Sequence, residues 1–290
     1  MKPAPFRYVA AESLASALAL KAQHGDDARF LAGGQSLIPA MNFRLAQPAM
    51  LVDVNPLRDL DYVRAAGDGG LRVGALTRTR ALERDALLAE RQPLVHEAVP
   101  HVAHPQIRNR GTLGGNLAHA DPASELPAVL LALGARLRAQ SSRGERWIEA
   151  QHFFVGVLTT ALRADEMLVE VELPKLPPRT GTCFMEVARR RGDYAMMGVA
   201  AVVALADDGA CTHAALGYCN AGATPVPGTA AARVLVGAHV GDAQIRAAAA
   251  AVERELDPPG NVHASKAFQR HLAGVLTRRA LQTALVRARL

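Results

Sequence analysis

Two glycine pairs, each near a hydroxyl side chain, are the features of this sequence that point most directly to ligand binding. The first pair lies in Leu31-Ala32-Gly33-Gly34-Gln35-Ser36, between a predicted strand and a helical turn. Adjacent glycines let the backbone curl with positive φ and leave no Cβ to block a ligand. Such a curl turns N–H groups toward one point, where they bind phosphate oxygens. Most Gly-Gly turns are structural, and this one is neither G-x-G-x-x-G nor a P-loop.

The second pair lies in the segment 111–125, GTLGGNLAHADPASE, again beside a hydroxyl residue and now followed by an amide. Ser124 or Asp121 could cap the helix that comes next, which gives part of this polarity a structural reason. Two phosphate-binding loops suit a ligand with two phosphates and a long body, and FAD fits that description. We expect valine in place of Gly33 or Gly114 to leave a folded protein without cofactor.

The first loop is expected within a small βαβ-like unit of about residues 1–57. The pattern predicts a strand at 6–9 and a helix from about Ser13 that ends at Gly25. A second strand at 29–31 runs directly into the glycine pair, and a further strand at 50–54 closes the unit.

The second loop is expected within about residues 58–176, a region that mixes strands and helices. Gly67 to Gly70 separate two strand patterns and indicate a hairpin. The other predicted elements are helices at about 77–99 and 123–133, and strands at 136–138, 146–148 and 168–173. The last of these strands alternates strictly, and Trp147 is expected to be a core residue.

A proline-rich stretch that ends at Gly181 marks the clearest linker. Beyond it the sequence predicts an antiparallel hairpin around Asp207-Asp208-Gly209, with strands at 199–206 and 211–217. Helical patterns follow at 229–236, 242–256 and 265–287. The predicted fold class is therefore α+β, with a cofactor domain of about 1–176 and a smaller α+β domain of about 180–290.

The cysteine and histidine residues form no recognisable metal site. The three cysteines (Cys183, Cys211 and Cys219) contain no C-x-x-C pair, so an iron–sulfur cluster would have to come from another chain. His101, His104 and His119 lie near Asp121 in the sequence, but their spacing matches no ligand pattern. We expect these histidines to be structural or to lie behind the site.

Charge and hydropathy argue against nucleic-acid and membrane functions. The net charge is +6, but the basic residues are dispersed and the densest run, Arg189 to Arg191, is only three long. No window reaches the roughly 18 apolar residues that a membrane span requires. Pro3, Pro5 and Arg7 interrupt the start where a signal peptide needs an apolar core, so we expect a cytoplasmic protein.

The segments around the glycine pairs, LAGGQSLIPAMNFR and IRNRGTLGGNLAHADPASELPAVLLALGA, resemble the flavoprotein subunits of carbon monoxide dehydrogenase and related molybdenum hydroxylases. The same fold resembles the PCMH-type FAD domain of xanthine dehydrogenase. The similarity covers nearly the whole chain, including FMEVARRRGDYAMMGVA and the C-terminal helices. It implies a two-part PCMH-type FAD-binding domain followed by a C-terminal domain like that of the carbon monoxide dehydrogenase flavoprotein.

The resemblance also implies which residues bind FAD. The pyrophosphate would be held by Ala32, Gly33, Gly34, Gln35 and Ser36, flanked by Leu31 and Leu37. The second wall would consist of Thr112, Leu113, Gly114 and Gly115, with Asn116 and Ala118 nearby. Glu125 would bind a sugar or ribityl hydroxyl, Leu168 would border the flavin ring, and Tyr194 would cover it. Met185 stands where xanthine dehydrogenase-like sequences carry a lysine near the flavin, which leaves the tuning of the flavin potential open.

By resemblance, the chain is an electron-transfer subunit. A large subunit with the molybdenum cofactor would oxidise the substrate, and a small [2Fe–2S] subunit would pass electrons to FAD on this chain and on to a terminal acceptor. The complex would be a dimer of heterotrimers. One alternative is a stand-alone FAD-dependent oxidase or reductase of the same fold superfamily, for which His119 is the least implausible acid or base. A non-catalytic basic binding module is a second alternative.

Overall fold

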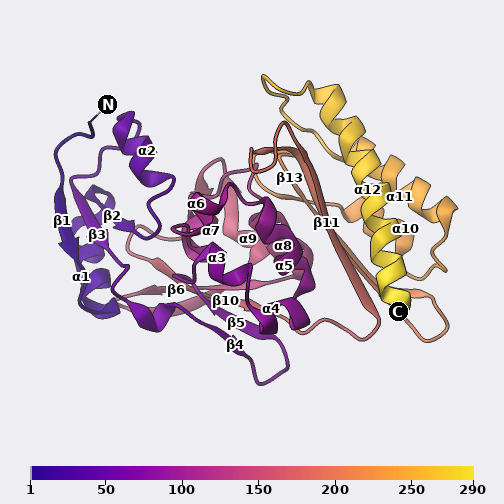
Figure 1. The fold of residues 1–290 in the computed structure, drawn as a ribbon, viewed down its shortest axis with the longest axis horizontal. Helices are drawn as coiled ribbons and strands as arrows, with labels where there is room; N and C mark the ends of the chain where they lie inside the picture. Colours follow the sequence, from indigo (N-terminus) through magenta and orange to yellow (C-terminus); the bar gives the residue numbers. More distant parts are fainter. Residues whose placement is uncertain (1) are drawn as a thin grey trace.

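The computed structural model describes residues 2–290, which form three sheet-centred layers side by side along the long axis (Figure 1). The N-terminal sheet lies at one end, and the long C-terminal helix α12 (Lys266–Arg289) lies at the other. Helices and antiparallel strands are both abundant in the larger part of the chain, so the predicted α+β class is confirmed.

The N-terminal sheet is parallel, with strand order β1-β3-β2. Its strands are β1 (Arg7–Ala10), β2 (Ala28–Leu31) and β3 (Met50–Asp53), and α1 (Leu14–His24) and α2 (Leu37–Asn42) connect them. Ala10 and Leu31 both pair with Asp53, so the carboxyl ends of all three strands meet at one edge. Ligands of parallel sheets bind at this edge, and the first glycine pair follows β2 there.

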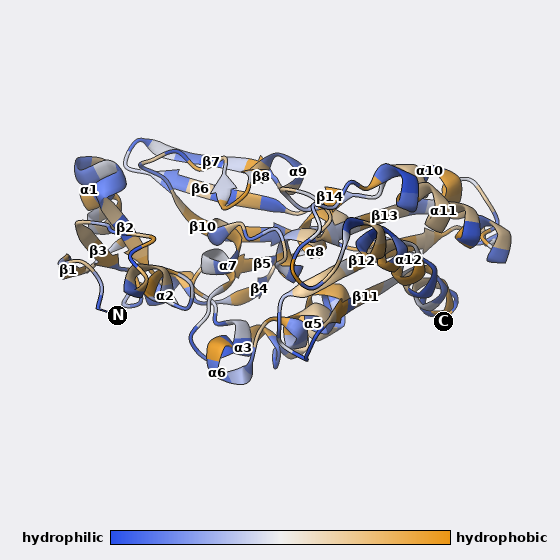
Figure 2. Ribbon diagram, turned by 90° about the horizontal axis from the view of Figure 1, so that it is seen from above, coloured by the Kyte–Doolittle hydropathy of each residue, from blue (hydrophilic) through white to orange (hydrophobic). Residues whose placement is uncertain are grey.

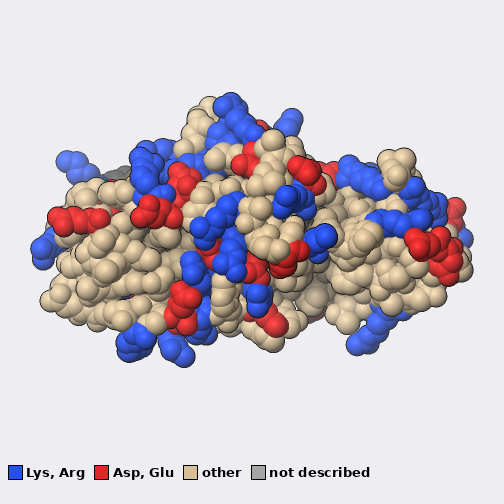
Figure 3. Space-filling view, turned by 90° about the horizontal axis from the view of Figure 1, so that it is seen from below, with Lys and Arg blue, Asp and Glu red and all other residues tan. Residues whose placement is uncertain are grey.

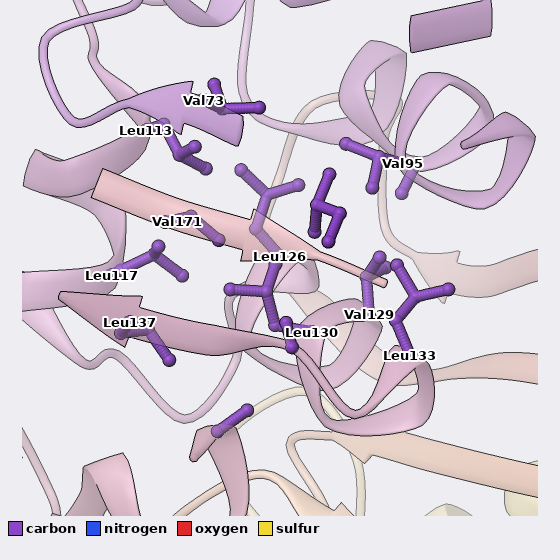
Figure 4. Packing of buried hydrophobic residues seen from close by; sticks show 14 of the residues in the cluster. Val73, Val95, Leu113, Leu117, Leu126, Val129, Leu130, Leu133, Leu137 and Val171 are labelled. Carbon is purple, nitrogen blue, oxygen red and sulfur yellow. The ribbon is translucent and has the colours of Figure 1, made fainter. Parts of the chain in front are cut away.

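The central sheet is antiparallel, with strand order β4-β5-β10-β6-β7. Its strands are β4 (Val63–Ala65), β5 (Leu71–Gly74), β6 (Arg136–Ser141), β7 (Gly144–Glu149) and β10 (Met167–Leu173). The accompanying helices are α3 (Thr79–Leu82), α4 (Ala86–Arg91), α5 (Pro93–Ala98), α6 (Pro105–Arg108), α7 (Leu113–His119), α8 (Glu125–Leu133) and α9 (Ala150–Phe153). Apolar side chains of α7, α8 and the sheet gather into one buried core (Figure 4).

The C-terminal sheet is antiparallel, with strand order β11-β12-β13-β14. Its strands are β11 (Thr180–Ala188), β12 (Ala195–Leu205), β13 (Cys211–Cys219) and β14 (Val226–Pro227). Helices α10 (Thr229–Leu235), α11 (Asp242–Glu255) and α12 cover one face, as Figure 2 shows from above. The other face packs on the central part, because Phe184, Ala200 and Val202 belong to the central core.

Most predicted elements are confirmed, and the differences have physical reasons. The helical region at 77–99 is three short helices, because Arg78, Asp85 and Pro93 start new helices within it. Strand β11 was not predicted, and Gly181 lies inside it rather than in a linker. A Cβ at Gly181 would collide with the carbonyl of Ala284, so this glycine permits close packing of α12.

The strand predicted at 168–173 is confirmed as β10, whereas the expectation that Trp147 is a core residue is wrong. Strand β10 alternates apolar and acidic residues, yet all seven of its residues are buried. Its acidic face is covered because Glu170 and Glu172 form ion pairs with arginines of the neighbouring strands, including Arg72 and Arg138. Trp147 is only half-buried on this same arginine-covered face and is not part of the apolar core.

Within residues 2–290, no helix has both the length and the apolar character needed to cross a membrane. On the face in Figure 3, Lys and Arg alternate with Asp and Glu, and no continuous basic stripe forms there.

Candidate functional site

The two glycine segments, far apart in the sequence, touch each other in the structure. A Cβ at Gly33 would lie 2.5 Å from the carbonyl oxygen of Arg110 and 2.8 Å from Cα of Gly111. A Cβ at Gly115 would lie 3.9 Å from Cβ of Ala32. Gly33 is therefore required by the approach of the second segment, and the two segments form one site rather than two.

The first glycine segment presents an unusually open backbone. Within residues 2–290, none of the N–H groups from Ala32 to Leu37 donates to an acceptor of the protein. Gly34 has φ +73°, which a non-glycine residue rarely adopts, and Ser36 is exposed and makes no side-chain capping bond. Successive free amides of this kind form an anion-binding concavity.

A cavity of about 490 Å³ adjoins these amides. It is lined by Tyr8, Leu31, Ala32, Gly33, Gly34, Gln35, Ile38, Pro39, Asp53, Asn55 and Arg110. Five of the predicted site residues therefore line it, whereas the second segment contributes only its neighbour Arg110. The cavity lies beside the first loop rather than between the two loops, because the loops themselves are in contact.

The second glycine segment is not an open loop. Gly114 and Gly115 lie in α7, which Thr112 caps through a hydrogen bond from the N–H of Gly115 to its Oγ1 at 3.1 Å. The N–H of Leu113 donates to the carbonyl of Thr77 at 2.9 Å, and that of Gly114 donates to Ala75 at 2.8 Å. The expectation of free phosphate-binding amides here is wrong, because the protein itself uses them.

Position 114 requires a glycine because Ala75 packs directly against it. A Cβ there would lie 2.6 Å from Cβ of Ala75 and 2.8 Å from its carbonyl oxygen, so α7 rests directly on the chain after β5. Valine at Gly114, like valine at Gly33, would force backbone to move. These substitutions therefore do not give the simple loss of cofactor that the sequence suggested. Thr112 and Leu113 are buried as well, whereas Gly115 and Ala118 form the exposed face of α7.

Two residues that the sequence analysis missed hold the segments together. Arg78 donates through Nη1 to the carbonyl of Arg110 at 2.5 Å and through Nη2 to Oδ1 of Asn55 at 2.6 Å. Nδ2 of Asn55 in turn donates to the carbonyls of Leu31 and Ala32, at 3.2 and 2.9 Å. Asn55 could have been found, because it follows β3 at the same sheet edge as the glycine pair.

Asp53 anchors this network at the sheet edge. It accepts a hydrogen bond from the hydroxyl of Tyr8 at 2.5 Å and others from the backbone and side chain of Asn55. Burial alone would raise the pKa of Asp53, but these hydrogen bonds outweigh it and hold the pKa below its usual value. The cavity wall therefore carries a carboxylate at neutral pH.

The remaining predicted residues lie toward the C-terminal sheet. Asn116 accepts a hydrogen bond from Ser124 at 2.9 Å, which ties α7 to the start of α8. Tyr194 is 65% exposed as a whole residue. Desolvation of its hydroxyl, together with the nearby carboxylate of Asp121, raises its pKa to about 12. Leu168 is only 4% exposed and belongs to the central core, next to an irregularity in β10, so little of its surface is free for a ligand.

Glu125 is almost completely buried at the start of α8, with 4% of its surface exposed. Burial raises its pKa to about 8, and the negative charge of Glu186 adds to the effect. Glu186 lies on β11, and its Oε1 is 3.1 Å from Nδ1 of His101. Glu186 could not be found from the sequence, because its partner His101 is distant in the chain and meets it only in the folded structure.

Met185 does not face this region. It packs against the apolar cluster formed by α11 and α12, whereas its neighbours Phe184 and Glu186 face the central part. Alternation along β11 explains the difference, since successive side chains point to opposite faces. The expectation that Met185 lies where a lysine would contact a flavin is therefore not supported. Within residues 2–290, no group of His, Cys, Asp and Glu could hold a metal ion.

Comparison with known proteins identifies the family. The family model described as "FAD binding domain in molybdopterin dehydrogenase" matches residues 4–176, and "CO dehydrogenase flavoprotein C-terminal domain" matches residues 182–284. The chain belongs to this family of molybdopterin dehydrogenase flavoproteins. The fold is therefore an FAD-binding domain followed by a smaller C-terminal domain, as predicted.

Relatives of this flavoprotein cover its whole length. It is 43% identical to the 6-hydroxypseudooxynicotine dehydrogenase complex subunit alpha of Paenarthrobacter nicotinovorans, over 100% of this chain and 97% of that one. It is 36% identical to the carbon monoxide dehydrogenase medium chain of Afipia carboxidovorans, over 100% of both. The structure matches carbon monoxide dehydrogenase from Hydrogenophaga pseudoflava with a TM-score of 0.96, 34% identity and 99% coverage of each chain. The resemblance stated from sequence is confirmed, and FAD is the cofactor of the matched domain.

Proposed function

We propose that this flavoprotein binds FAD with the pyrophosphate on the open amides of Ala32 to Leu37. The single observation that carries the proposal is this run of free N–H groups beside a cavity of about 490 Å³. The residues present fit the group, because the amides and Arg110 suit phosphate oxygens and the cavity has room for the adenosine half. Ser36 adds a hydroxyl donor.

The second segment has a different task in this proposal. Gly115, Asn116 and Ala118 form a wall along which the cofactor extends toward the C-terminal domain. Thr112, Leu113 and Gly114 support that wall from behind. Tyr194 covers the flavin ring, since a tyrosine ring can stack on a planar face while its hydroxyl stays hydrogen-bonded. Leu168 offers the ring only the 4% of its surface that is exposed, and Glu125 lies close to the ribityl side.

We place the chain as the electron-transfer subunit of a larger enzyme. The medium chain of a carbon monoxide dehydrogenase and a subunit of a dehydrogenase complex are among its relatives. In the proposed complex, a large subunit holds the molybdenum cofactor and a small subunit holds [2Fe–2S] clusters, as a dimer of heterotrimers. When bound, FAD would supply the redox chemistry that links one-electron donors to a two-electron terminal acceptor. This chain's residues bind and orient the cofactor.

The burial of all three cysteines supports the need for a partner subunit that carries the iron–sulfur clusters. Cys183, Cys211 and Cys219 are all buried, and burial raises the pKa of each thiol. Buried, protonated thiols are poor metal ligands, and a typical cluster needs four of them. Isolation of the complex from the host should yield two further chains, molybdenum and iron. Hydroxylation of a substrate by this chain alone, with only FAD and an acceptor, would contradict the proposal.

Cofactor binding can be tested with a matched pair of variants. The purified chain should be yellow and release FAD, not FMN, on denaturation. Ala118→Trp places a large ring on the exposed face of α7 and should lower FAD affinity by at least about tenfold, because steric overlap removes binding energy. Ala250→Trp, at an exposed alanine of α11, is the control. Equal FAD affinity in both variants, with both folded, would place the cofactor elsewhere.

A further inference from the structure

The cavity beside the first glycine segment is lined by groups of opposite charge. The free amides of Ala32 to Leu37 and the side chain of Arg110 attract anions. The same lining includes the side chains of Asp53 and Tyr8. A phosphate group would be repelled by a carboxylate, so Asp53 has a task other than binding the pyrophosphate.

Asp53 is held beside the amides by Asn55. Nδ2 of Asn55 donates to Oδ1 of Asp53 at 2.6 Å and to the carbonyl of Ala32 at 2.9 Å. The sheet register agrees, because Asp53 on β3 pairs with Leu31 at the end of β2. A ligand group at Asp53 is therefore a close neighbour of a phosphate bound to the amides that begin at Ala32.

The carboxylate of Asp53 has one acceptor position left. A carboxylate accepts about four hydrogen bonds in all. Oδ1 accepts two from Asn55, through its backbone N–H and its Nδ2, and Oδ2 accepts one from the hydroxyl of Tyr8 at 2.5 Å. The lowered pKa of Asp53 keeps it ionised, and the proton of Tyr8 is already used in this bond. The pair can therefore accept a hydrogen bond from a ligand, but it has no proton to donate to one.

We propose that Asp53 and Tyr8 bind the ribose hydroxyls of the adenosine half of FAD and reject adenine nucleotides whose ribose carries a phosphate. The proposal rests on the proposed function, because pyrophosphate on the amides of Ala32 to Leu37 brings the adjoining ribose to Asp53. A ribose hydroxyl donates to Oδ2, whereas a phosphate there can only accept and adds negative charge beside a carboxylate. Ile38 and Pro39 offer apolar cavity wall to the base.

The first measurement compares two probes that share one pyrophosphate, ADP-ribose and its 2′-phosphate ester. Calorimetric titration of the full chain without cofactor should show that ADP-ribose binds at least about tenfold more tightly, because the ester loses a charge-assisted hydrogen bond and meets a like charge. Equal dissociation constants, in a chain that also binds FAD, would overturn this proposal alone. A chain that binds neither FAD nor either probe would overturn the proposed function as well.

The second measurement repeats the comparison in variants. Asp53→Asn removes the charge at nearly constant shape and should reduce the preference for ADP-ribose to less than about threefold. Asp59→Asn removes an exposed carboxylate outside the cavity, and this control should keep the native preference. An unchanged preference in Asp53→Asn would overturn the proposal.

Tyr8→Phe provides a test that does not depend on the folding of Asp53→Asn. The carboxylate remains, so rejection of the 2′-phosphate ester should persist. Loss of the Tyr8 hydroxyl should weaken the binding of ADP-ribose by about three- to tenfold, because a hydrogen bond to the ribose is lost. Loss of the discrimination between the two probes in Tyr8→Phe would show that Asp53 is not its source.

Discussion

The two glycine segments have nearly the same composition and opposite tasks. Both place adjacent glycines beside a hydroxyl residue, yet the first keeps its amides from Ala32 to Leu37 free and the second uses its amides within the protein. Gly34 needs its positive φ, whereas Gly114 needs to be small because Ala75 lies against it. The difference teaches that a glycine pair indicates a ligand only where the backbone donors remain available.

The carboxyl groups beside the two segments differ in the same way. Asp53, beside the first segment, accepts hydrogen bonds from Tyr8 and Asn55 and stays ionised. Glu125, the last residue of the second segment, has no cationic partner and keeps its proton near neutral pH. Asp53 thus presents a charged group to a ligand, whereas Glu125 is held in the buried interior.

Gly114→Val is expected to have the largest effect, and it tests whether the second glycine segment serves packing rather than phosphate binding. The added side chain overlaps Ala75, so we expect the free energy of unfolding to fall by about 3 kcal/mol or more. Urea denaturation of the FAD-free chain measures this directly. Ser36→Val in the first segment is the control and should stay within about 0.5 kcal/mol, because Ser36 is exposed. If Gly114→Val instead keeps the native stability and loses FAD, the second segment is a phosphate-binding loop.

The pH dependence of stability should separate the two carboxyl groups. The folded-state pKa of Glu125, about 8, lies above its unfolded value, so its contribution is complete below about pH 4.5 and is lost as pH rises toward 8. The loss should amount to a few kcal/mol, and Glu125→Gln should remove it. The lowered pKa of Asp53 acts in the opposite direction, since its contribution is lost as the pH falls below its usual range. Chemical denaturation between pH 4 and 9 measures both contributions to the free energy of unfolding. If Glu125→Gln leaves the pH dependence of this free energy unchanged, Glu125 does not have a raised pKa.

Arg78→Met should loosen the contact between the segments without filling the site. Loss of charge-assisted hydrogen bonds to Arg110 and Asn55 should weaken FAD binding by about 10- to 100-fold. FAD titration of the apoprotein gives the affinity. Arg64→Met, on the outer face of the central sheet, serves as control and should bind FAD normally. If the two variants bind FAD equally well, the contact between the segments does not preorganise the site.

Tyr194→Ala should have the smallest effect on binding. The pyrophosphate contacts remain, so we expect FAD affinity to change by less than about threefold. The flavin absorbance should shift, and electron delivery to the acceptor should slow, because one face of the ring becomes exposed to water. Spectroscopy and rapid-reaction kinetics of the variant test this. An unchanged flavin spectrum with lowered stability would mean that Tyr194 only packs in its turn.

Local patterns were sufficient for much of the fold. Ser13 caps α1 as expected, Gly134 ends α8 with positive φ, and Gly69 lies in the hairpin turn between β4 and β5. The three C-terminal helices were predicted within two residues because their apolar spacing is regular. The domain limits at about 176 and 180 stay a prediction.

Long-range contacts account for what the sequence could not give. Asn55 and Arg78 are ordinary polar residues until β3 and α3 bring them to the two glycine segments. Trp147 looks apolar in a strand but lies under arginines contributed by other strands. Met185 faces the C-terminal apolar cluster and Glu186 faces the central part, because pairing with β12 fixes which face of β11 meets the central domain.

Residue order and local backbone preference were enough to predict the family, most element types and the segment that carries the free amides. The tertiary structure decided which donors of the two glycine pairs remain free and which carboxyl group keeps its proton. Hydrogen-bond saturation and desolvation depend on neighbours that come from distant parts of the chain, as Ala75 does for Gly114 and Glu186 does for Glu125.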